Sequence, residues 1–292
     1  MKKISWKKRK IVLDYYNEFL NKKGIISRQG RGFLKFHPSS FGDCLRKIAF
    51  QYHSEQNDKY KINIATDIKF MKICDAGHAF HDRMQYDFSK MGILRGWWRC
   101  KKCNKILGKE NKIGIFLPDI CDCIEDPLVD KRRGLKLFEY EEIFLKSEEE
   151  FNFQGNCDGI IEIEKDNPDL RFIIDFKSIN EKSYGNLFTS EPNKKYTIQV
   201  MIYMWLSGIH KAILYFEDKN KHEISEYVID YDEEAVEEIK NTSRKLKKIC
   251  ELGGIPKIPQ GYSSNNSPCN SFFGKCDYYD FCYLDKKGGR VF

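Results

Sequence analysis

The sequence lacks the segments that would identify a membrane, secreted or repetitive protein. It has no run of apolar residues long enough to cross a membrane, and it does not begin with a secretory signal peptide. It also has no internal repeat and no low-complexity tract, which excludes a solenoid or a disordered linker protein. We therefore expect a folded protein of the reducing cytoplasm that has no membrane partner.

Neither sign of charge is scarce, so the electrostatic bias is modest. The 292 residues include 50 Lys or Arg and 43 Asp or Glu, and the net charge is +7. This small basic excess favours a nucleic-acid partner. A candidate phosphate-contacting arm lies at the N-terminus, although an ordinary solvated terminus fits equally well. The basic residues of this arm are Lys2, Lys3, Lys7, Lys8, Arg9, Lys10, Arg28, Arg31 and Lys35.

The hydrophobic pattern predicts an α/β protein with a mixed sheet flanked by helices. Helices are predicted at 5–22, 39–52, 66–91, 194–208 and 231–252, with a short helix before 188. Strands are predicted at 136–145, 151–164, 170–177, 211–217 and 222–230. We divide the chain into a helical N-terminal region (1–65), a core (66–252) and a cysteine-rich tail (253–292).

The stretch 155–177 contains a pair of acids that can bind a metal ion. Asp158 stands in a G-x-x-D-G sequence on one predicted strand, and Asp175 stands two residues before Lys177 on the next. Strand side chains alternate, so Lys177 and Asp175 face the same side. Two carboxylates on neighbouring strands can share Mg²⁺ or Mn²⁺. A solvated surface hairpin is the alternative, but both acids adjoin apolar β-branched residues, where an unpaired charge is costly.

Two predicted helices add polar groups to this pair. An apolar stripe on helix 66–91 consists of Ile73, Gly77, Phe80, Met84 and Phe88. His81 lies about 60° from the centre of this stripe and His78 about 120° from it. His81 can therefore reach a half-buried site, or act only as a hydrogen-bonded boundary residue, whereas His78 faces solvent or substrate. Gln199 and Tyr203 are four residues apart and share one helix face, so they can act together as a polar pair. The alternative is an amphipathic helix in which Tyr203 only packs.

These residues resemble, in order, the motifs of the PD-(D/E)XK nuclease superfamily and in particular its RecB-like branch. Residues 77–81 are similar to the G-x-x-x-H helix of that branch, and residues 199–203 to its Q-x-x-x-Y helix. Asp158 resembles the second motif, and Asp175-Phe176-Lys177 resembles the acid-x-Lys motif. The match extends over roughly residues 39–285 as an ordered set of motifs. The resemblance implies a restriction-endonuclease-like fold.

The resemblance also implies a Mg²⁺- or Mn²⁺-dependent deoxyribonuclease. Its implied metal ligands are His81, Asp158, Asp175 and the main-chain carbonyl of Phe176. Lys177 would position the attacking water or stabilise the transition state, and Gln199 and Tyr203 would orient the DNA strand. We expect an exonuclease or flap-type nuclease that acts on single-stranded DNA or DNA ends in recombination, replication or repair, encoded by a virus or mobile element. The alternatives are a DNA-binding accessory subunit with little nuclease activity and a purely structural interaction module.

Eleven cysteines in a reducing compartment indicate metal binding rather than disulfides. Four of them form a Cys100-x2-Cys103 pair and a Cys121-x-Cys123 pair, and the first pair resembles a zinc knuckle. Four thiolates from two hairpins suit tetrahedral Zn²⁺. We therefore expect a zinc ribbon inserted at about 96–125. The ribbon would grip single-stranded DNA or dock a partner protein, and its nearby aromatic and basic residues are Trp97, Trp98, Arg99, Lys101 and Lys102.

A second set comprises Cys44, Cys269, Cys276 and Cys282. One cysteine before the core and three after it resemble the flanks of the iron–sulfur nucleases, namely AddB-type subunits and the CRISPR adaptation exonucleases. The resemblance implies a structural [4Fe–4S] cluster that clasps the two ends of the chain. The interval between Cys269 and Cys276 is longer than in the family, and a second Zn²⁺ on the same thiolates is the alternative. Buried hydrophobic positions are expected for the remaining cysteines, Cys74, Cys157 and Cys250.

Overall fold

The computed structural model of the chain describes residues 18–20, 32–62, 68–123, 137–165, 167–187, 193–265, 269–271 and 274–283. Most of the predicted helix 5–22 and all of the basic arm except Lys35 lie outside these ranges. Lys35 pairs with Glu149, with 2.7 Å between Nζ and Oε2. No helix within the described ranges is both long enough and apolar enough to span a membrane.

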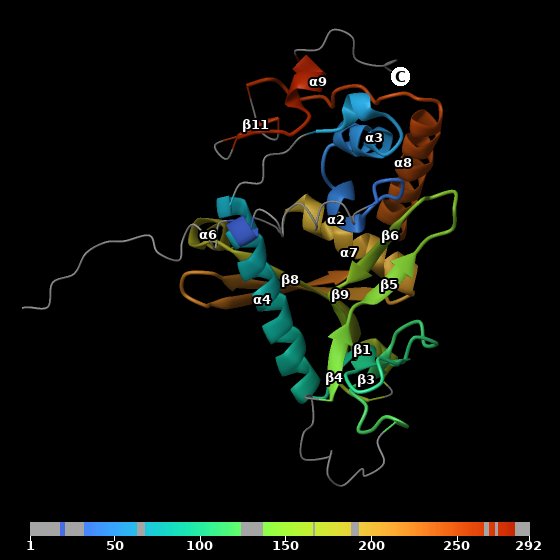
Figure 1. Ribbon diagram of the computed structural model, residues 1–292, viewed down its shortest axis with the longest axis vertical. Helices are drawn as coiled ribbons and strands as arrows, with labels where there is room; N and C mark the ends of the chain where they lie inside the picture. Colours follow the sequence, from blue (N-terminus) through green and yellow to red (C-terminus); the bar gives the residue numbers. More distant parts are fainter. Residues whose placement is uncertain are drawn as a thin grey trace, which may run out of the picture.

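A mixed sheet forms the centre of the molecule (Figure 1). Within the described residues its main path runs β10-β9-β8-β7-β1-β2, and β3 and β4 also pair with β1. β8 and β9 are parallel, and the other neighbours are antiparallel. The strands are β1 (Leu94–Cys100), β2 (Ile106–Leu107), β3 (Ile115–Phe116), β4 (Phe138–Glu141), β7 (Gly159–Glu162), β8 (Arg171–Ile179), β9 (Lys211–Asp218) and β10 (Ile224–Asp230). The predicted mixed sheet is confirmed.

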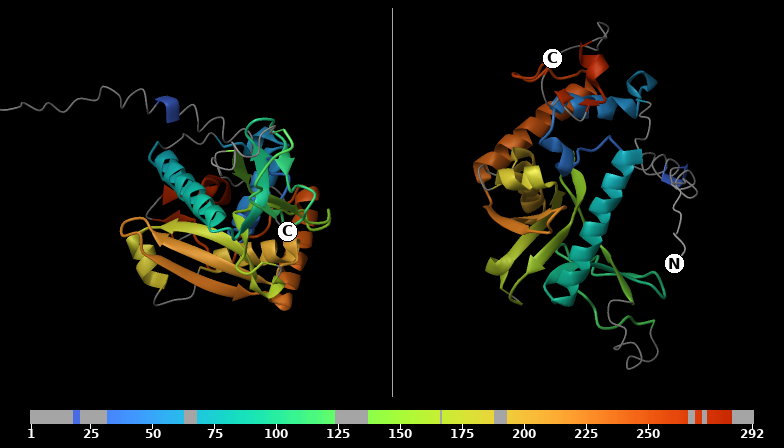
Figure 2. Two further views of the ribbon diagram at one scale, coloured as in Figure 1. Left: turned by 90° about the horizontal axis from the view of Figure 1, so that it is seen from below. Right: turned by 90° about the vertical axis from the view of Figure 1, so that its left-hand side faces the viewer.

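Helices cover both faces of this sheet (Figures 1 and 2). α4 (Ile68–Lys90) packs Phe80 and Met84 against Ile174 and Phe176 of β8. On the opposite face, Ile173 of β8 belongs to the core that includes α7 and α8. The other helices are α2 (Pro38–Phe41), α3 (Leu45–Ser54), η1 (Asp58–Tyr60), η3 (Pro168–Leu170), α6 (Glu181–Leu187), α7 (Lys194–Ser207), α8 (Glu233–Glu251) and α9 (Tyr279–Tyr283). Alternate residues of β8 therefore face different helices.

Two long strands of the sequence prediction are each interrupted. The predicted strand 136–145 consists of β4 and β5 (Ile143–Lys146), and the predicted strand 151–164 consists of β6 (Gln154–Cys157) and β7. β5 and β6 form a separate two-stranded sheet in which Ile143 is opposite Cys157. The chain thus leaves the large sheet at Glu142 and rejoins it at Asp158. The next step in the register of β5 and β6 brings these two acids opposite each other.

The predicted helix 39–52 was also wrong as a single element. It consists of α2 and α3, separated by Gly42, Asp43 and Cys44, and Cys44 is the N-cap of α3. A Cβ on Gly42 would lie 2.6 Å from Cα of Lys195, so only glycine allows α2 to pack this closely on α7. The remaining short strands, β11 (Asn270–Ser271) and β12 (Gly274–Lys275), form a hairpin in the tail.

Candidate active site

A cluster of three metal-ligating side chains lies where the chain passes between the two sheets. His81 comes from α4, Glu142 from the β4–β5 junction and Asp158 from the β6–β7 junction. One ligand atom from each of the three lies within 4.8 Å of the other two. His81 Nδ1 is 3.5 Å from Asp158 Oδ1, and the other Asp158 oxygen accepts the Phe176 main-chain N–H at 2.7 Å. The cluster joins one imidazole and two carboxylates at a half-buried position.

Glu142 belongs to this cluster although the sequence does not single it out. It is the last acid of the run Glu139-Tyr140-Glu141-Glu142, and the sequence gives no reason to prefer it. The structure separates the two final acids, because Glu141 pairs with Arg99 whereas Glu142 turns toward Asp158. Gln85 of α4 supports the junction by donating to the main-chain carbonyl of Asp158 at 2.9 Å and to Glu142 at 3.4 Å.

The two histidines of α4 differ in burial, because they lie at different angles around the helix. Phe80 and Met84 are buried against the sheet, while His81 is half-buried and packs edge-on to the Phe176 ring with 5.8 Å between centroids. His78 is exposed. The stripe predicted from the sequence is shorter than expected, because Ile73 at its start is 47% exposed.

A second polar cluster surrounds Asp175 on the α7 side of β8. Asp175 is fully buried, and its Oδ2 is 2.5 Å from Lys177 Nζ. Gln199 Nε2 donates to Asp175 Oδ1 at 2.8 Å. The Tyr203 hydroxyl donates to the carbonyl of Asn156 at 2.6 Å and thereby fixes β6 two residues before Asp158. The β8 backbone connects both clusters, because Phe176 stands between Asp175 and Lys177 and donates its N–H to Asp158.

Burial and the neighbouring charges shift the pKa values of these acids in different directions. Burial, together with the charge of Asp158, raises the pKa of Glu142 to about 7. Burial also raises the pKa of Asp175 to about 6, although Lys177 opposes the shift. Burial disfavours ionised Asp158 as well, but the hydrogen bond and charge of His81 prevail and lower its pKa.

Lys177 keeps its proton in this environment. Burial alone would lower the pKa of its ammonium group, but the charges of Asp175 and Asp158 outweigh burial and raise it. Three carboxylates therefore face one ammonium group and one imidazole. This excess of oxygen ligands and negative charge suits a divalent cation.

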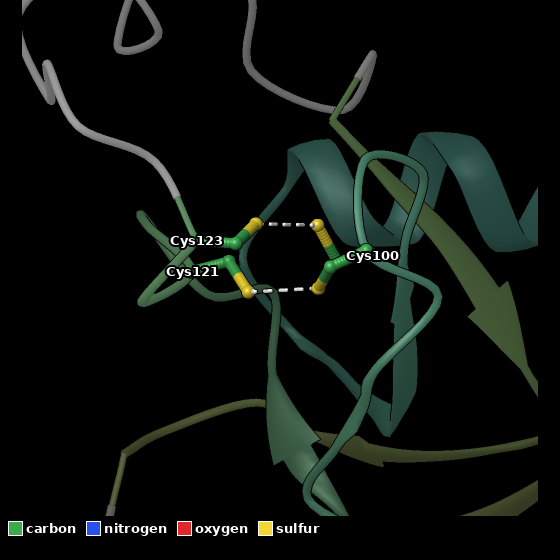
Figure 3. A group of neighbouring side chains, drawn as sticks. Cys100, Cys121 and Cys123 are labelled. Atoms are coloured by element: carbon green, nitrogen blue, oxygen red, sulfur yellow. Dashed lines mark hydrogen bonds between the residues drawn. The ribbon is translucent and has the colours of Figure 1, made fainter.

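The first cysteine set forms a compact cluster at the end of β1 (Figure 3). The four sulfurs all lie within 4.8 Å of one another, with 3.5 Å between Cys100 and Cys123 and 3.7 Å between Cys103 and Cys121. Cys100 and Cys121 are buried against Trp98 and Phe138. Burial opposes ionisation of Cys100, but N–H groups of Cys103 and Lys102 and the neighbouring thiols lower its pKa to about 7. The cluster has the ligand type and size for one metal ion.

The expected stacking role of this ribbon was wrong for Trp98. Its side chain is fully buried, and its indole Nε1 donates to the carbonyl of Ile115 at 3.0 Å. Trp97 is half-buried and packs against the main core, and Arg99 is paired with Glu141. Lys101 and Lys102 remain exposed.

The second cysteine set lines a cavity of about 490 Å³. Figure 1 shows α3 and α9, which border it, at the other end of the molecule from β1. The cysteines of the cavity come from the start of α3 and from the tail around α9: Cys44, Cys269, Cys276 and Cys282. Although the structure describes all four, their sulfurs do not all lie within 4.8 Å of one another. The cavity thus spaces its thiols more widely than the compact cluster does. Of the remaining cysteines, Cys157 and Cys250 are buried as predicted, and Cys74 is half-buried.

Comparison with known proteins gives weak structural similarities. No family model matches the sequence, and no curated protein matches it. A solved structure of a protein called SSO0001 is 15% identical, with 82% of this chain and 86% of that chain covered and a TM-score of 0.42. The alkaline exonuclease LHK-Exo from Laribacter hongkongensis is 17% identical, with 39% and 57% covered and a TM-score of 0.33.

A phage-related exonuclease from Haemophilus somnus 129PT is 18% identical, with 37% and 58% covered and a TM-score of 0.26. The matched regions span less than two thirds of either exonuclease. Exonucleases therefore occur among the structural neighbours, but at these TM-scores the likeness assigns no function. The function has to be inferred from the chemistry of the side chains.

Proposed function

We propose that this protein is a divalent-metal-dependent DNA nuclease that hydrolyses phosphodiester bonds, and that it acts as an exonuclease. The observation that supports this most directly is the His81–Glu142–Asp158 group beside the buried Asp175–Lys177 pair. A phosphodiester-cleaving centre needs oxygen-rich metal ligands and a cation close to the scissile phosphate. Both occur here side by side, with the metal ligands on α4 and at the junctions between the two sheets and the ammonium group on β8.

The residues present fit a hard divalent cation. His81, Glu142 and Asp158 would hold it, with Asp175 and the Phe176 carbonyl as further proposed ligands from the next strand. A bound Mg²⁺ or Mn²⁺ would supply Lewis-acid chemistry, which neutralises charge on the phosphate and activates a water. An imidazole beside two carboxylates suits Mn²⁺ at least as well as Mg²⁺.

Lys177 and α7 would complete the site. The Lys177 ammonium stays protonated, so it can stabilise the negative charge that develops on the phosphate oxygens. Asp175 and Gln199 hold this region of β8 by a direct hydrogen bond, and Tyr203 anchors β6. Gln199 and Tyr203 are thereby positioned to act through Asp175 and Asp158, in addition to any contact with the DNA strand.

The two cysteine sites fit different cofactors. Tetrahedral Zn²⁺ with bonds of about 2.3 Å separates its sulfurs by about 3.8 Å, which agrees with the compact cluster. The wider cavity suits a [4Fe–4S] cluster, because four irons and four sulfides lie between the cysteine sulfurs. We assign Zn²⁺ to Cys100, Cys103, Cys121 and Cys123, and the iron–sulfur cluster to Cys44, Cys269, Cys276 and Cys282. Both would have structural roles.

The nuclease proposal is tested with anaerobically purified protein and end-labelled single- and double-stranded DNA in Mg²⁺ or Mn²⁺. Asp158→Asn, Asp175→Asn and Lys177→Ala should each reduce cleavage by at least about 10³-fold, because each removes a ligand or the ammonium group. His81→Ala should cost far more activity than His78→Ala. Full activity of Asp175→Asn would refute the nuclease assignment, and loss of cleavage with intact DNA binding would support it.

The role of Glu142 is tested by metal binding in the absence of DNA. Mn²⁺ binding, followed by electron paramagnetic resonance, should weaken by about 10–100-fold in Glu142→Gln. Glu141→Gln is the matched control, because Glu141 is the neighbouring acid and pairs with Arg99 instead. Equal Mn²⁺ affinity in both variants would remove Glu142 from the ligand set.

A further inference from the structure

A buried arginine donates a hydrogen bond to one of the cavity cysteines. Arg46 is 6% exposed, and its Nε donates to the Cys282 sulfur at 3.2 Å. One terminal nitrogen donates to the carbonyl of Pro256 at 2.6 Å, and the guanidinium lies over the Phe50 ring. Within the described ranges, no carboxylate forms an ion pair with Arg46. A buried guanidinium needs a negative partner, and the Cys282 sulfur is the group placed to be one.

A second donor points at another cavity sulfur. The Tyr283 hydroxyl donates to the Cys269 sulfur at 3.3 Å. Cys44 is the N-cap of the ten-residue helix α3, and its sulfur receives no capping hydrogen bond from the helix. Two of the four cavity cysteines, Cys269 and Cys282, therefore receive hydrogen bonds of the kind that stabilise thiolates rather than thiols.

We infer that Arg46 and Tyr283 are positioning residues that stabilise the reduced form of the cluster and so raise its reduction potential. This inference rests on the iron–sulfur assignment proposed above. Hydrogen bonds to ligand sulfur withdraw electron density from the thiolate, and a buried positive charge favours the state that carries the additional electron. The effect of Arg46 should exceed that of Tyr283, because only Arg46 contributes a full charge.

The structural role of Arg46 can be separated from its electrostatic role. Arg46 also connects α3 to the start of the tail through Pro256. His53 makes an equivalent connection, because its ring nitrogen bonds the carbonyl of Gly254 at 2.9 Å. His53 has no hydrogen bond to a cavity sulfur, so His53→Gln disturbs the same junction and leaves the charge at the cysteines unchanged.

The test compares wild type, Arg46→Lys, Arg46→Gln, Tyr283→Phe and His53→Gln after anaerobic purification. Iron per chain, the thermal midpoint and the reduction potential are measured, the last by titration with a chemical reductant that supplies one electron per cluster. Arg46→Gln should shift the potential to more negative values, with smaller negative shifts in Arg46→Lys and Tyr283→Phe. His53→Gln should lower the thermal midpoint without shifting the potential.

The results of these measurements distinguish this inference from the iron–sulfur assignment and from the nuclease proposal. Iron-loaded Arg46→Gln and Tyr283→Phe with the wild-type potential would overturn it, and so would a shift of equal size in His53→Gln. If Arg46→Gln does not fold, Arg46→Lys and Tyr283→Phe decide by the same criterion. Wild-type protein that holds zinc and no iron would overturn the cluster assignment and this inference together. Loss of nuclease activity in Asp175→Asn would still support the nuclease in that case.

Discussion

The two cysteine sites contain the same number of thiols, yet the chain builds them in different ways. The compact cluster takes its four cysteines from a stretch of 24 residues, Cys100–Cys123, at the end of β1. The cavity combines Cys44 with three cysteines of residues 269–282. In Figure 1, β1 lies toward one end of the molecule, and α3 and α9 lie at the other. Closing the longer loop costs more chain entropy, so the cavity depends more strongly on the rest of the fold.

The packing around the two sites also differs, because one borders a small separate core and the other borders the main core. Trp98 and Phe138 pack with the compact cluster in a small core of their own. The cavity borders the main core, where Tyr278 stacks on Phe50 with 5.2 Å between ring centroids. A cofactor that joins α3 to the tail should therefore support global stability, whereas one in the compact cluster should support a local insertion.

The largest effect is expected for Cys276→Ala. Without one thiolate the cavity should lose its cofactor, and the tail should separate from α3. Because metal binding contributes directly to folding free energy, the protein should be insoluble or lose about 10 °C or more in its thermal midpoint. Metal analysis of anaerobic protein should show about four irons per chain in wild type and none in the variant. An unchanged midpoint would remove the distinction between the two sites.

Cys100→Ala should have a smaller and more local effect. It should abolish the single zinc while the iron remains, and it should lower the stability by about 3 kcal/mol. Hydrogen exchange would then increase mainly around β2 and β3. If this variant lost both metals, the two sites would depend on each other. The compact cluster would then not be a local feature.

Glu142→Gln provides a reference outside both cysteine sites. In the folded protein the pKa of Glu142 is raised to about 7, so between about pH 4.5 and 7 the folded state binds more protons than the unfolded state. Stability should therefore fall as the pH rises through this window. Without added Mg²⁺ or Mn²⁺, the variant should be more stable than wild type by about 3 kcal/mol at pH 8 and nearly equal at pH 4.

Denaturant unfolding at the two pH values measures this difference, and zinc and iron contents should stay unchanged. Glu141→Gln should leave the pH dependence near 7 as in wild type. A stability of Glu142→Gln that followed wild type at every pH would show that Glu142 ionises normally.

The smallest effect is expected for Asp122→Asn. Asp122, which lies between Cys121 and Cys123, pairs at 2.9 Å with Lys105, which follows the Cys100–Cys103 pair. Both side chains are exposed. Solvent-screened pairs of this kind contribute little. Thermal unfolding should show no measurable change, and zinc should be retained in full. A clear loss of zinc would mean that the ion pair, and not only the thiolates, holds the two cysteine pairs together.

The sequence alone predicted the long elements that carry the candidate site, and it grouped the cysteines into two sets of four. The periods of α4, α7 and β8 follow from residues a few positions apart, so His81 and the Asp175–Lys177 pair could be placed before any tertiary contact was known. The mixed sheet flanked by helices followed from the order of these elements. The spacing of Cys100–Cys103 and Cys121–Cys123 predicted a common site, because short hairpins bring such residues together.

Only the tertiary structure showed that Glu142 lies beside Asp158, because both acids mark the points where the chain changes sheets. That juxtaposition depends on the register of β5 with β6, which no local period reveals. The same limit applies to Trp98, which is buried by packing between distant strands, and to the width of the cysteine cavity. Spacing along the chain determines which thiols can meet locally, whereas packing of α3 against the tail determines how far apart the sulfurs of the second set lie.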